Sequence, residues 1–168
     1  KASFAANIRH EKQGVSESFE GTIQMKGDKF VLITPDTRTW YDGTTQWTYV
    51  VRTDEVNLSN PTGDELEFTN PMTLLRSFTL SYIGQSTSDN GKMADDVMLT
   101  SKKNGDVAKV EVQIERATSL PVRLTVTLKN GMCSVIRIRK MQTEISQPEH
   151  VFRFNPADYP GVTEIDLR

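Results

Sequence analysis

Apolar and polar residues alternate with a period of two along most of this sequence. The segment 109–115 reads KVEVQIE and the segment 123–129 reads RLTVTLK, so every second side chain in both is apolar. Such alternation is typical of antiparallel strands that have one buried face and one wet face. A parallel sheet needs crossover helices between its strands, and the intervals between these segments leave no room for them. The sequence therefore predicts a mainly β fold built as a meander of antiparallel hairpins.

Turn lengths decide which residues of a hairpin share a face. Two-residue loops at 27–28 and 104–105 keep the apolar residues of both flanking strands on one side. At 129–131, a two-residue loop would turn Ile136 to the polar face. A three-residue loop with Gly131 in a left-handed conformation sets Leu124 opposite Ile136 instead. We therefore expect the three-residue loop.

The alternation breaks between residues 60 and about 81. Asn60-Pro61 and Asn70-Pro71 each place a capping side chain before a proline at the first helical position. The apolar residues after the second proline have helical spacing: Met72, Leu74, Leu75 and Phe78. The sequence predicts two short helices here, which either cover an open face or end of a curved sheet as a lid or plug its core.

The C-terminal part returns to the strand pattern, with Phe152 and Phe154 on one face, and ends in a short strand over 162–167. No repeat, low-complexity tract or linker-like run divides the 168 residues. We expect one domain, residues 1–168, with the helical insertion at about 60–81.

The charge balance excludes one large class of partner. The chain has 20 basic and 22 acidic residues, mixed along its length, with a formal net charge of −2. Nucleic-acid binding needs a clustered basic face, so no nucleic-acid partner is expected. No apolar run reaches the roughly 20 residues of a membrane-spanning helix. Residue 1 leads at once into a strand-like segment, as in a mature or trimmed chain.

No group of residues has the pattern of a catalytic or metal site. His10 and His150 each stand beside a glutamate in a polar stretch, without a second ligand at metal-binding spacing. Cys133 is the single cysteine and is expected to pack in a strand as a small apolar residue. The pairs 54–55 and 95–96 are acidic neighbours whose side chains point to opposite faces of a strand. We expect no enzyme activity, no metal and no cofactor.

Aromatic residues stand out instead. Trp40 and Trp47 flank a turn at 42–45, and Tyr49 follows in phase with Trp47. If 42–45 closes a hairpin, both tryptophans project from the same face. Aromatic side chains from several strands on one face either fill a core or line an apolar pocket. The periodicity leaves both outcomes open.

Five short segments, in their order along the chain, give a family resemblance. They are similar to motifs of the LolA family of outer-membrane lipoprotein carriers, over nearly the whole chain. The segments are KASF at 1–4, EGTI at 20–23, DGTTQWTY at 42–49, TNPMTLL at 69–75, and FRFNP at 152–156 followed by PGV at 160–162.

This resemblance implies a half-open antiparallel β-barrel with a short helical lid over an apolar cavity. It implies a periplasmic carrier that takes the acyl chains of lipoproteins from an inner-membrane release complex and passes them to an outer-membrane acceptor. The expected cavity and lid residues are Phe4, Phe19, Ile23, Met25, Phe30, Leu32, Trp40, Trp47, Tyr49, Met72, Leu74, Leu75, Phe78, Phe152 and Phe154. The alternatives are a binding protein of the same fold for a free lipid or another small apolar ligand, and an interaction module with a filled core.

The sequence departs from the family pattern in two places. The family has an amphipathic helix before its first strand, and this chain begins at that strand. The family also carries an arginine, thought to latch the lid, in a hairpin whose nearest counterpart here is 26–32, with Gly27 where the arginine is expected. The latch is therefore not carried over, and the sequence resembles a divergent branch.

Overall fold

The computed structural model describes residues 1–10, 14–62, 66, 78–101 and 106–168. Twelve strands lie in these ranges. They are β1 (Ala2–His10), β2 (Val15–Lys26), β3 (Lys29–Ile33), β4 (Thr37–Tyr41), β5 (Gln46–Val50), β6 (Glu55–Ser59), β7 (Phe78–Thr87), β8 (Met93–Ser101), β9 (Val107–Glu115), β10 (Leu120–Leu128), β11 (Met132–Met141) and β12 (Thr163–Asp166). Two 3-10 turns, η1 (Glu149–Phe152) and η2 (Pro156–Asp158), precede the last strand.

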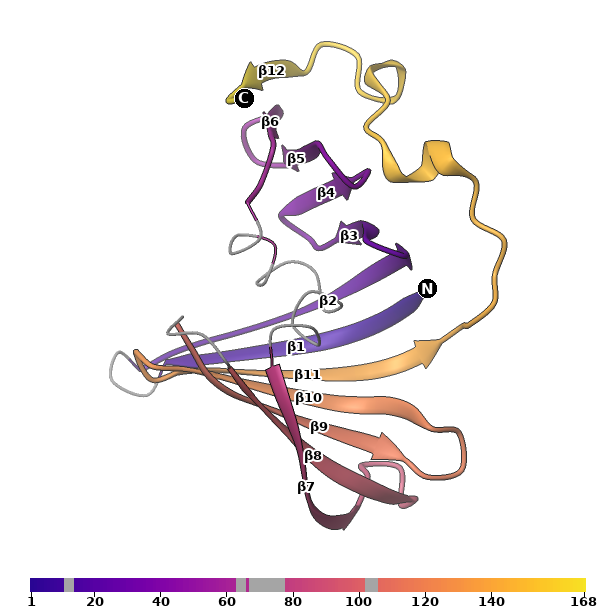
Figure 1. The fold of residues 1–168 in the computed structure, drawn as a ribbon. Coiled ribbons are helices and arrows are strands. Elements are labelled where there is room, and N and C mark those ends of the chain that lie inside the picture. Colours follow the sequence, from indigo (N-terminus) through magenta and orange to yellow (C-terminus); the bar gives the residue numbers. More distant parts are fainter. Residues whose placement is uncertain (11–13, 63–65, 67–77, 102–105) are drawn as a thin grey trace. The chain divides into compact units, whose positions relative to one another are not determined.

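The strands form one open, mostly antiparallel sheet. Its order is β12-β6-β5-β4-β3-β2-β1-β11-β10-β9-β8-β7 (Figure 1), so β12 and β7 are the two edges. The predicted mainly β fold is confirmed. Two pairings depart from the predicted meander, since β1 lies beside β11 and β12 runs parallel to β6. A parallel neighbour requires a long connection, and the chain between β11 and β12 supplies it.

The chain divides into two compact units. Unit 1 comprises Lys1–Ala2, Gly21–Leu74 and Gln142–Arg168, and unit 2 comprises Ser3–Glu20 and Leu75–Met141. The prediction of one domain over residues 1–168 stays a prediction.

The predicted hairpin registers are confirmed. The loop at 129–131 has the expected three residues, and Gly131 has a φ of 91°, a conformation that suits glycine. Apolar residues therefore face apolar partners at the positions that the alternation predicts. The cross-strand pairs are Met25–Phe30, Leu99–Val110 and Leu124–Ile136.

The predicted helical insertion is corrected at its C-terminal end. Phe78 was expected on a helix, but it is the first residue of β7, pairs with Ser101 and is buried. The segment from Phe78 onward is rich in aromatic and β-branched residues, which favour a strand when a neighbour such as β8 is present. Met72, Leu74 and Leu75 lie outside the described residues, so their helix stays a prediction.

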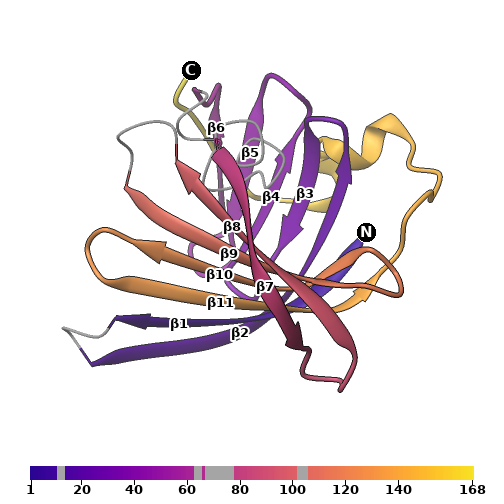
Figure 2. The same ribbon diagram turned by 60° about the horizontal axis from the view of Figure 1, so that its bottom comes forward.

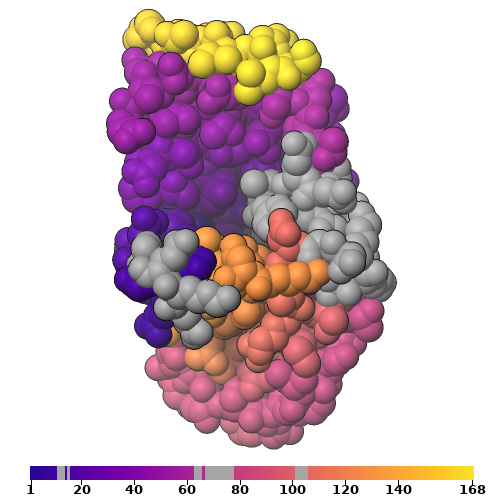
Figure 3. Space-filling model, turned by 90° about the vertical axis from the view of Figure 1, so that its left-hand side faces the viewer, coloured from indigo at the N-terminus to yellow at the C-terminus, as the bar shows by residue number. Residues whose placement is uncertain are grey.

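The strand expected around Phe152 and Phe154 is also wrong. Phe152 ends the 3-10 turn η1 and Phe154 follows it, and both side chains are buried. Asn155 then caps η2 by accepting a hydrogen bond from the Ala157 backbone N–H, with Pro156 inside the first turn. These local bonds favour turns over a strand. In the space-filling view the yellow C-terminal residues lie against the purple strands of unit 1 (Figure 3).

Within the described ranges, no helix is long and apolar enough to cross a membrane.

Candidate apolar binding surface

In unit 2, strands β8 to β11 place their aliphatic residues on one face of the sheet. The register sets Leu124 of β10 opposite Val112 of β9 on one side and opposite Ile136 of β11 on the other. Figure 2 shows these strands side by side. We call this surface the aliphatic face; its members are Val97, Leu99, Val110, Val112, Ile114, Leu124, Val126, Leu128, Ile136 and Ile138.

The aliphatic face is covered unevenly. Val97, Leu99 and Val110 are 8%, 4% and 1% exposed and so are covered, whereas Val112 and Ile114 of β9 are half-buried. Every residue of β10 is half-buried as well, and so are Ile136 and Ile138 of β11. Aliphatic side chains that stay partly open to water over two neighbouring strands form an apolar patch of the kind that marks binding surfaces. The sequence pattern had placed these residues on one face, but the predicted site did not include them.

Two phenylalanines extend this face. The rings of Phe4 on β1 and Phe19 on β2 meet edge to face, with centroids 6.3 Å apart. Glu20, the next residue of β2, forms an ion pair with Arg139 of β11 at 2.7 Å. Arg139 lies on the other side of β11 from Ile138, so Phe19 lies on the aliphatic side. These two predicted site residues therefore belong with the aliphatic face.

The opposite face of the same strands is polar. Glu115 is 3% exposed and accepts a hydrogen bond from the Lys92 ammonium at 2.9 Å, which lowers the pKa of its carboxyl group. Gln113, also 3% exposed, donates from Nε2 to the Ser86 hydroxyl at 2.6 Å. A pocket of about 190 Å³ on this side is lined mainly by polar residues, among them Asp96. The two faces of unit 2 thus differ sharply in chemistry.

In unit 1, the register separates the predicted cavity residues into two groups. Phe30 pairs with Tyr41, and Val31 pairs with Trp40, so Phe30 and Trp40 lie on opposite faces. Pairing with β2 places three further predicted residues on the Phe30 side, and pairing across β4 and β5 places two on the Trp40 side. The first group is Ile23, Met25, Phe30 and Leu32; the second is Trp40, Trp47 and Tyr49. One cavity within unit 1 cannot be lined by both groups.

The tryptophan side of unit 1 is filled by the chain's own C-terminal segment. The Tyr159 ring lies 5.8 Å from Trp40, 4.7 Å from Tyr49 and 5.2 Å from Phe154, measured between centroids. The Arg38 guanidinium donates to the Tyr159 hydroxyl at 2.7 Å. We call this packed group the aromatic cluster; it consists of Trp40, Trp47, Tyr49, Val56, Leu58, Phe154, Tyr159 and Val162. Trp40, Trp47 and Tyr49 therefore pack against the chain's own residues, although all three stay half-buried.

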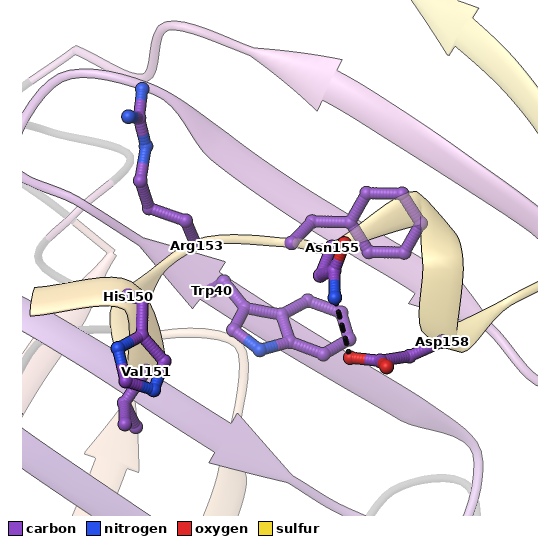
Figure 4. Close-up of a pocket in the computed structure, with 7 residues that line it drawn as sticks. Trp40, His150, Val151, Arg153, Asn155 and Asp158 are labelled. Carbon is purple, nitrogen blue, oxygen red and sulfur yellow. Dashed lines mark hydrogen bonds between the residues drawn. The ribbon is translucent and has the colours of Figure 1, made fainter.

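A shallow pocket of about 530 Å³ lies beside the aromatic cluster. Figure 4 shows the Trp40 indole in its middle, with Asn155 and Asp158 joined by a hydrogen bond of 3.2 Å on one side. Arg153 is directed away from the indole, and its guanidinium pairs with Asp42 at 3.1 Å. His150 stands at the rim. The polar groups Asn155, Asp158 and Arg153 thus bond to neighbouring side chains.

No group of three or more His, Cys, Asp or Glu side chains that could hold a metal ion occurs in the part of the chain that the structure describes.

Comparison with known proteins gives a family and a fold. The family model of the outer membrane lipoprotein carrier protein LolA matches residues 2–132. No curated protein matches the sequence.

Two solved structures share the fold at low sequence identity. An uncharacterized conserved protein from Thermus thermophilus superposes with a TM-score of 0.60 at 14% identity, covering 98% of this chain and 90% of that one. A LolA superfamily protein from Nitrosomonas europaea has a TM-score of 0.50 at 11% identity, covering 91% of this chain and 89% of that one. These likenesses concern the fold. The resemblance found in the sequence is confirmed by the family match, and the chain belongs to the LolA family of outer membrane lipoprotein carrier proteins.

Proposed function

We propose that this protein binds the acyl chains of lipoproteins on the aliphatic face of unit 2. In this proposal it is a non-enzymatic carrier in the periplasm. It receives lipid-modified proteins from an inner-membrane release complex and delivers them to an outer-membrane acceptor.

The half-open state of β10 and β11 is the observation that carries the proposal. Leu124, Val126 and Leu128 are aligned along one strand, and none of them is buried. Burying an acyl chain contributes about 0.8 kcal/mol per methylene, so even partial coverage by such a row binds a long chain firmly. A carrier must also release its cargo, and an apolar face without directional bonds supports exchange between membranes.

The remaining predicted residues take different parts in this proposal. Phe4 and Phe19 join the acyl-binding surface in unit 2, and Ile23, Met25, Phe30 and Leu32 form the apolar face of β2 and β3 in unit 1. Met72, Leu74 and Leu75 are proposed to cover the bound chain, because flexible apolar side chains repack readily against different shapes. The tryptophans, Tyr49, Phe152 and Phe154 are proposed to hold the C-terminal segment rather than cargo. Phe78 is proposed to support β7.

A pair of neighbouring substitutions tests the proposal. Val126→Lys places an ammonium group on the aliphatic face, and Thr125→Lys places the same group on the polar face, opposite Glu111. Both positions are half-buried in β10, so the two variants are closely matched. Covering a charge with an acyl chain carries a large desolvation cost. We expect Val126→Lys to weaken binding of a fluorescent diacylglyceryl-cysteine peptide by about tenfold or more, and Thr125→Lys to leave it nearly unchanged.

Circular dichroism of both variants provides the folding control. Equal affinities for the two folded variants would contradict binding on the aliphatic face. Mass spectrometry of lipid extracted from the purified protein then identifies the cargo class. A diacylated cysteine peptide supports the carrier, whereas a free lipid supports a binding protein of the same fold.

A further inference from the structure

The two edge strands of the sheet differ in how they are protected. Edge strands present unpaired backbone N–H and C=O groups, and proteins guard them with short length, charges or covering segments. β12 has four residues, two of which are acidic, and Asp166 is paired with Arg168 at 2.6 Å. β7 has ten residues, FTLSYIGQST, and none of them is charged. By length and charge, β12 is a guarded edge and β7 is not.

Most side chains of β7 after the buried Phe78 are exposed as well as uncharged. Leu80 is 62% exposed and Tyr82 is 58% exposed. Their cross-strand partners on β8 are Leu99 and Val97, which belong to the aliphatic face. Leu80 and Tyr82 therefore carry that face out to the edge of the sheet. On the other side of β7, no strand among the described ranges pairs with it.

An irregularity in β7 limits what can pair with it. The register with β8 shifts between Tyr82 and Gly84, so Ile83 is the extra residue of a bulge. Gly84 has a φ of 154°, a backbone conformation that residues other than glycine rarely adopt. A bulge bends and twists the strand and ends regular pairing on its outer side. The regular part of the free edge is therefore the short stretch Phe78–Tyr82, which fits a short extended segment better than a second copy of the whole strand.

We propose that the peptide following the acylated residue of a cargo lipoprotein adds to the sheet as an extended strand beside Phe78–Tyr82. This inference rests on the proposed function, because the bound acyl chains on the aliphatic face bring that peptide to β7. Strand addition uses main-chain hydrogen bonds for affinity, and apolar contacts at alternate positions add to it. Leu80 and Tyr82 provide those contacts. Main-chain bonding makes recognition tolerant of the cargo's sequence, as a carrier of several lipoproteins requires.

Backbone methylation of the cargo peptide tests strand addition without altering the protein. The probe is a diacylglyceryl-cysteine followed by a short alternating Thr–Val segment. Two further probes carry N-methyl groups at the odd or at the even positions of that segment. Successive N–H groups of a strand point to opposite sides, so one methylated set blocks pairing with β7 and the other leaves it open. We expect one methylated probe to bind about tenfold more weakly, from the loss of about two net hydrogen bonds, and the other to bind like the unmethylated probe.

Amide hydrogen exchange locates the contact. The unmethylated probe is expected to slow exchange at 78–82 relative to diacylglyceryl-cysteine without a peptide. If both methylated probes bind as well as the unmethylated one, or if exchange at 78–82 stays unchanged while lipid binds, strand addition is wrong and the proposed function stands.

Failure of every probe, including diacylglyceryl-cysteine alone, would overturn both proposals. Light scattering covers one further outcome. A dimer that protects 78–82 in the absence of peptide would mean that a second copy occupies this edge, which would also overturn the inference.

Discussion

Tyr159 shows how a single residue fixes the C-terminal segment of unit 1. Its ring contacts Trp40, Tyr49 and Phe154, and its hydroxyl group accepts a hydrogen bond from Arg38. The same guanidinium lies 5.7 Å from the centre of the ring. Tyr49 in turn donates to Asp54 at 2.9 Å, and this hydrogen bond is the main reason that the pKa of Tyr49 is raised. Aromatic packing and polar bonds therefore converge on one side chain.

Truncation of Tyr159 should accordingly destabilise the protein without affecting acyl binding. We expect Tyr159→Ala to lower the free energy of unfolding by about 2–3 kcal/mol, because a large half-buried ring is lost from the cluster. Tyr159→Phe removes the hydroxyl alone and should cost about 1 kcal/mol. Urea unfolding followed by tryptophan fluorescence measures both values. A Tyr159→Ala variant that is as stable as the wild type, or that is stable but no longer binds acyl probes, would contradict these roles.

At the scale of strands and turns, the C-terminal segment is attached to β2 and β3 by a small polar network. Glu149 of η1 accepts from the Lys26 ammonium at 2.7 Å and from the Lys29 ammonium at 2.5 Å. Gln147 donates from Nε2 to the Met25 carbonyl at 2.9 Å. The two lysines lower the pKa of Glu149 from 4.5 to about 2, chiefly through these hydrogen bonds. The carboxylate form is thus favoured in the folded protein.

The direction of this shift predicts a pH dependence. A carboxyl group whose pKa is lowered by folding stabilises the folded state above its ordinary pKa, and that contribution is lost as the pH falls through the folded value. We expect the attachment of η1 to weaken between about pH 4.5 and about pH 2. Amide exchange across 147–152, compared between wild type and Glu149→Gln, measures the effect.

The wild type should lose protection over this pH range, whereas Glu149→Gln should show a smaller change with pH. Glu164→Gln, a matched substitution on the exposed strand β12, should behave like the wild type. Identical pH profiles for wild type and Glu149→Gln would show that the network does not hold the segment.

Period-two alternation determines which features of the sheet could be predicted from the sequence. Within a hairpin with a tight turn, alternation fixes the register, so the pairing of Leu124 with Ile136 was predictable. Alternation carries no information about faces across an irregular turn. Between β3 and β4, Thr34 donates its backbone N–H to the Thr37 carbonyl at 2.9 Å, and the resulting register puts Trp40 on the opposite side from Phe30. The predicted site includes residues of both faces because the sequence pattern does not show how this turn shifts the alternation between β3 and β4.

Period-two alternation could not predict the parallel direction of β12 or the 3-10 conformation of η1, for related reasons. A strand's direction relative to its neighbour depends on the path of the connecting chain, which here passes through two 3-10 turns. Phe152 and Phe154 alternate as strand residues do, yet they lie between the ion pairs of Glu149 and the Asn155 cap of η2, and these local contacts favour turns. The family, by contrast, was recognisable from five short motifs, and the family match over residues 2–132 confirms it.

Across the whole molecule, the apolar surfaces of the two units have different tasks in the proposed function. The aromatic cluster of unit 1 is filled by the chain's own C-terminal segment. The aliphatic face of unit 2 is partly open at β10 and β11, and it reaches an uncharged edge strand. On the polar face of the same strands, the buried Gln113 donates to Ser86 and the buried Glu115 carboxylate accepts from Lys92. The proposed carrier function therefore depends on the aliphatic face of unit 2 and not on the aromatic cluster of unit 1.

Methyl NMR with a spin-labelled cargo tests this central claim most directly. The protein is labelled at Ile, Leu and Val methyl groups and mixed with a diacylglyceryl-cysteine peptide that carries a nitroxide on one acyl chain. Acyl binding on the aliphatic face predicts strong broadening at Leu124, Val126 and Ile136 and none at Val56 and Leu58 in the aromatic cluster. Broadening at Val56 and Leu58 with sharp signals from Leu124, Val126 and Ile136 would contradict it.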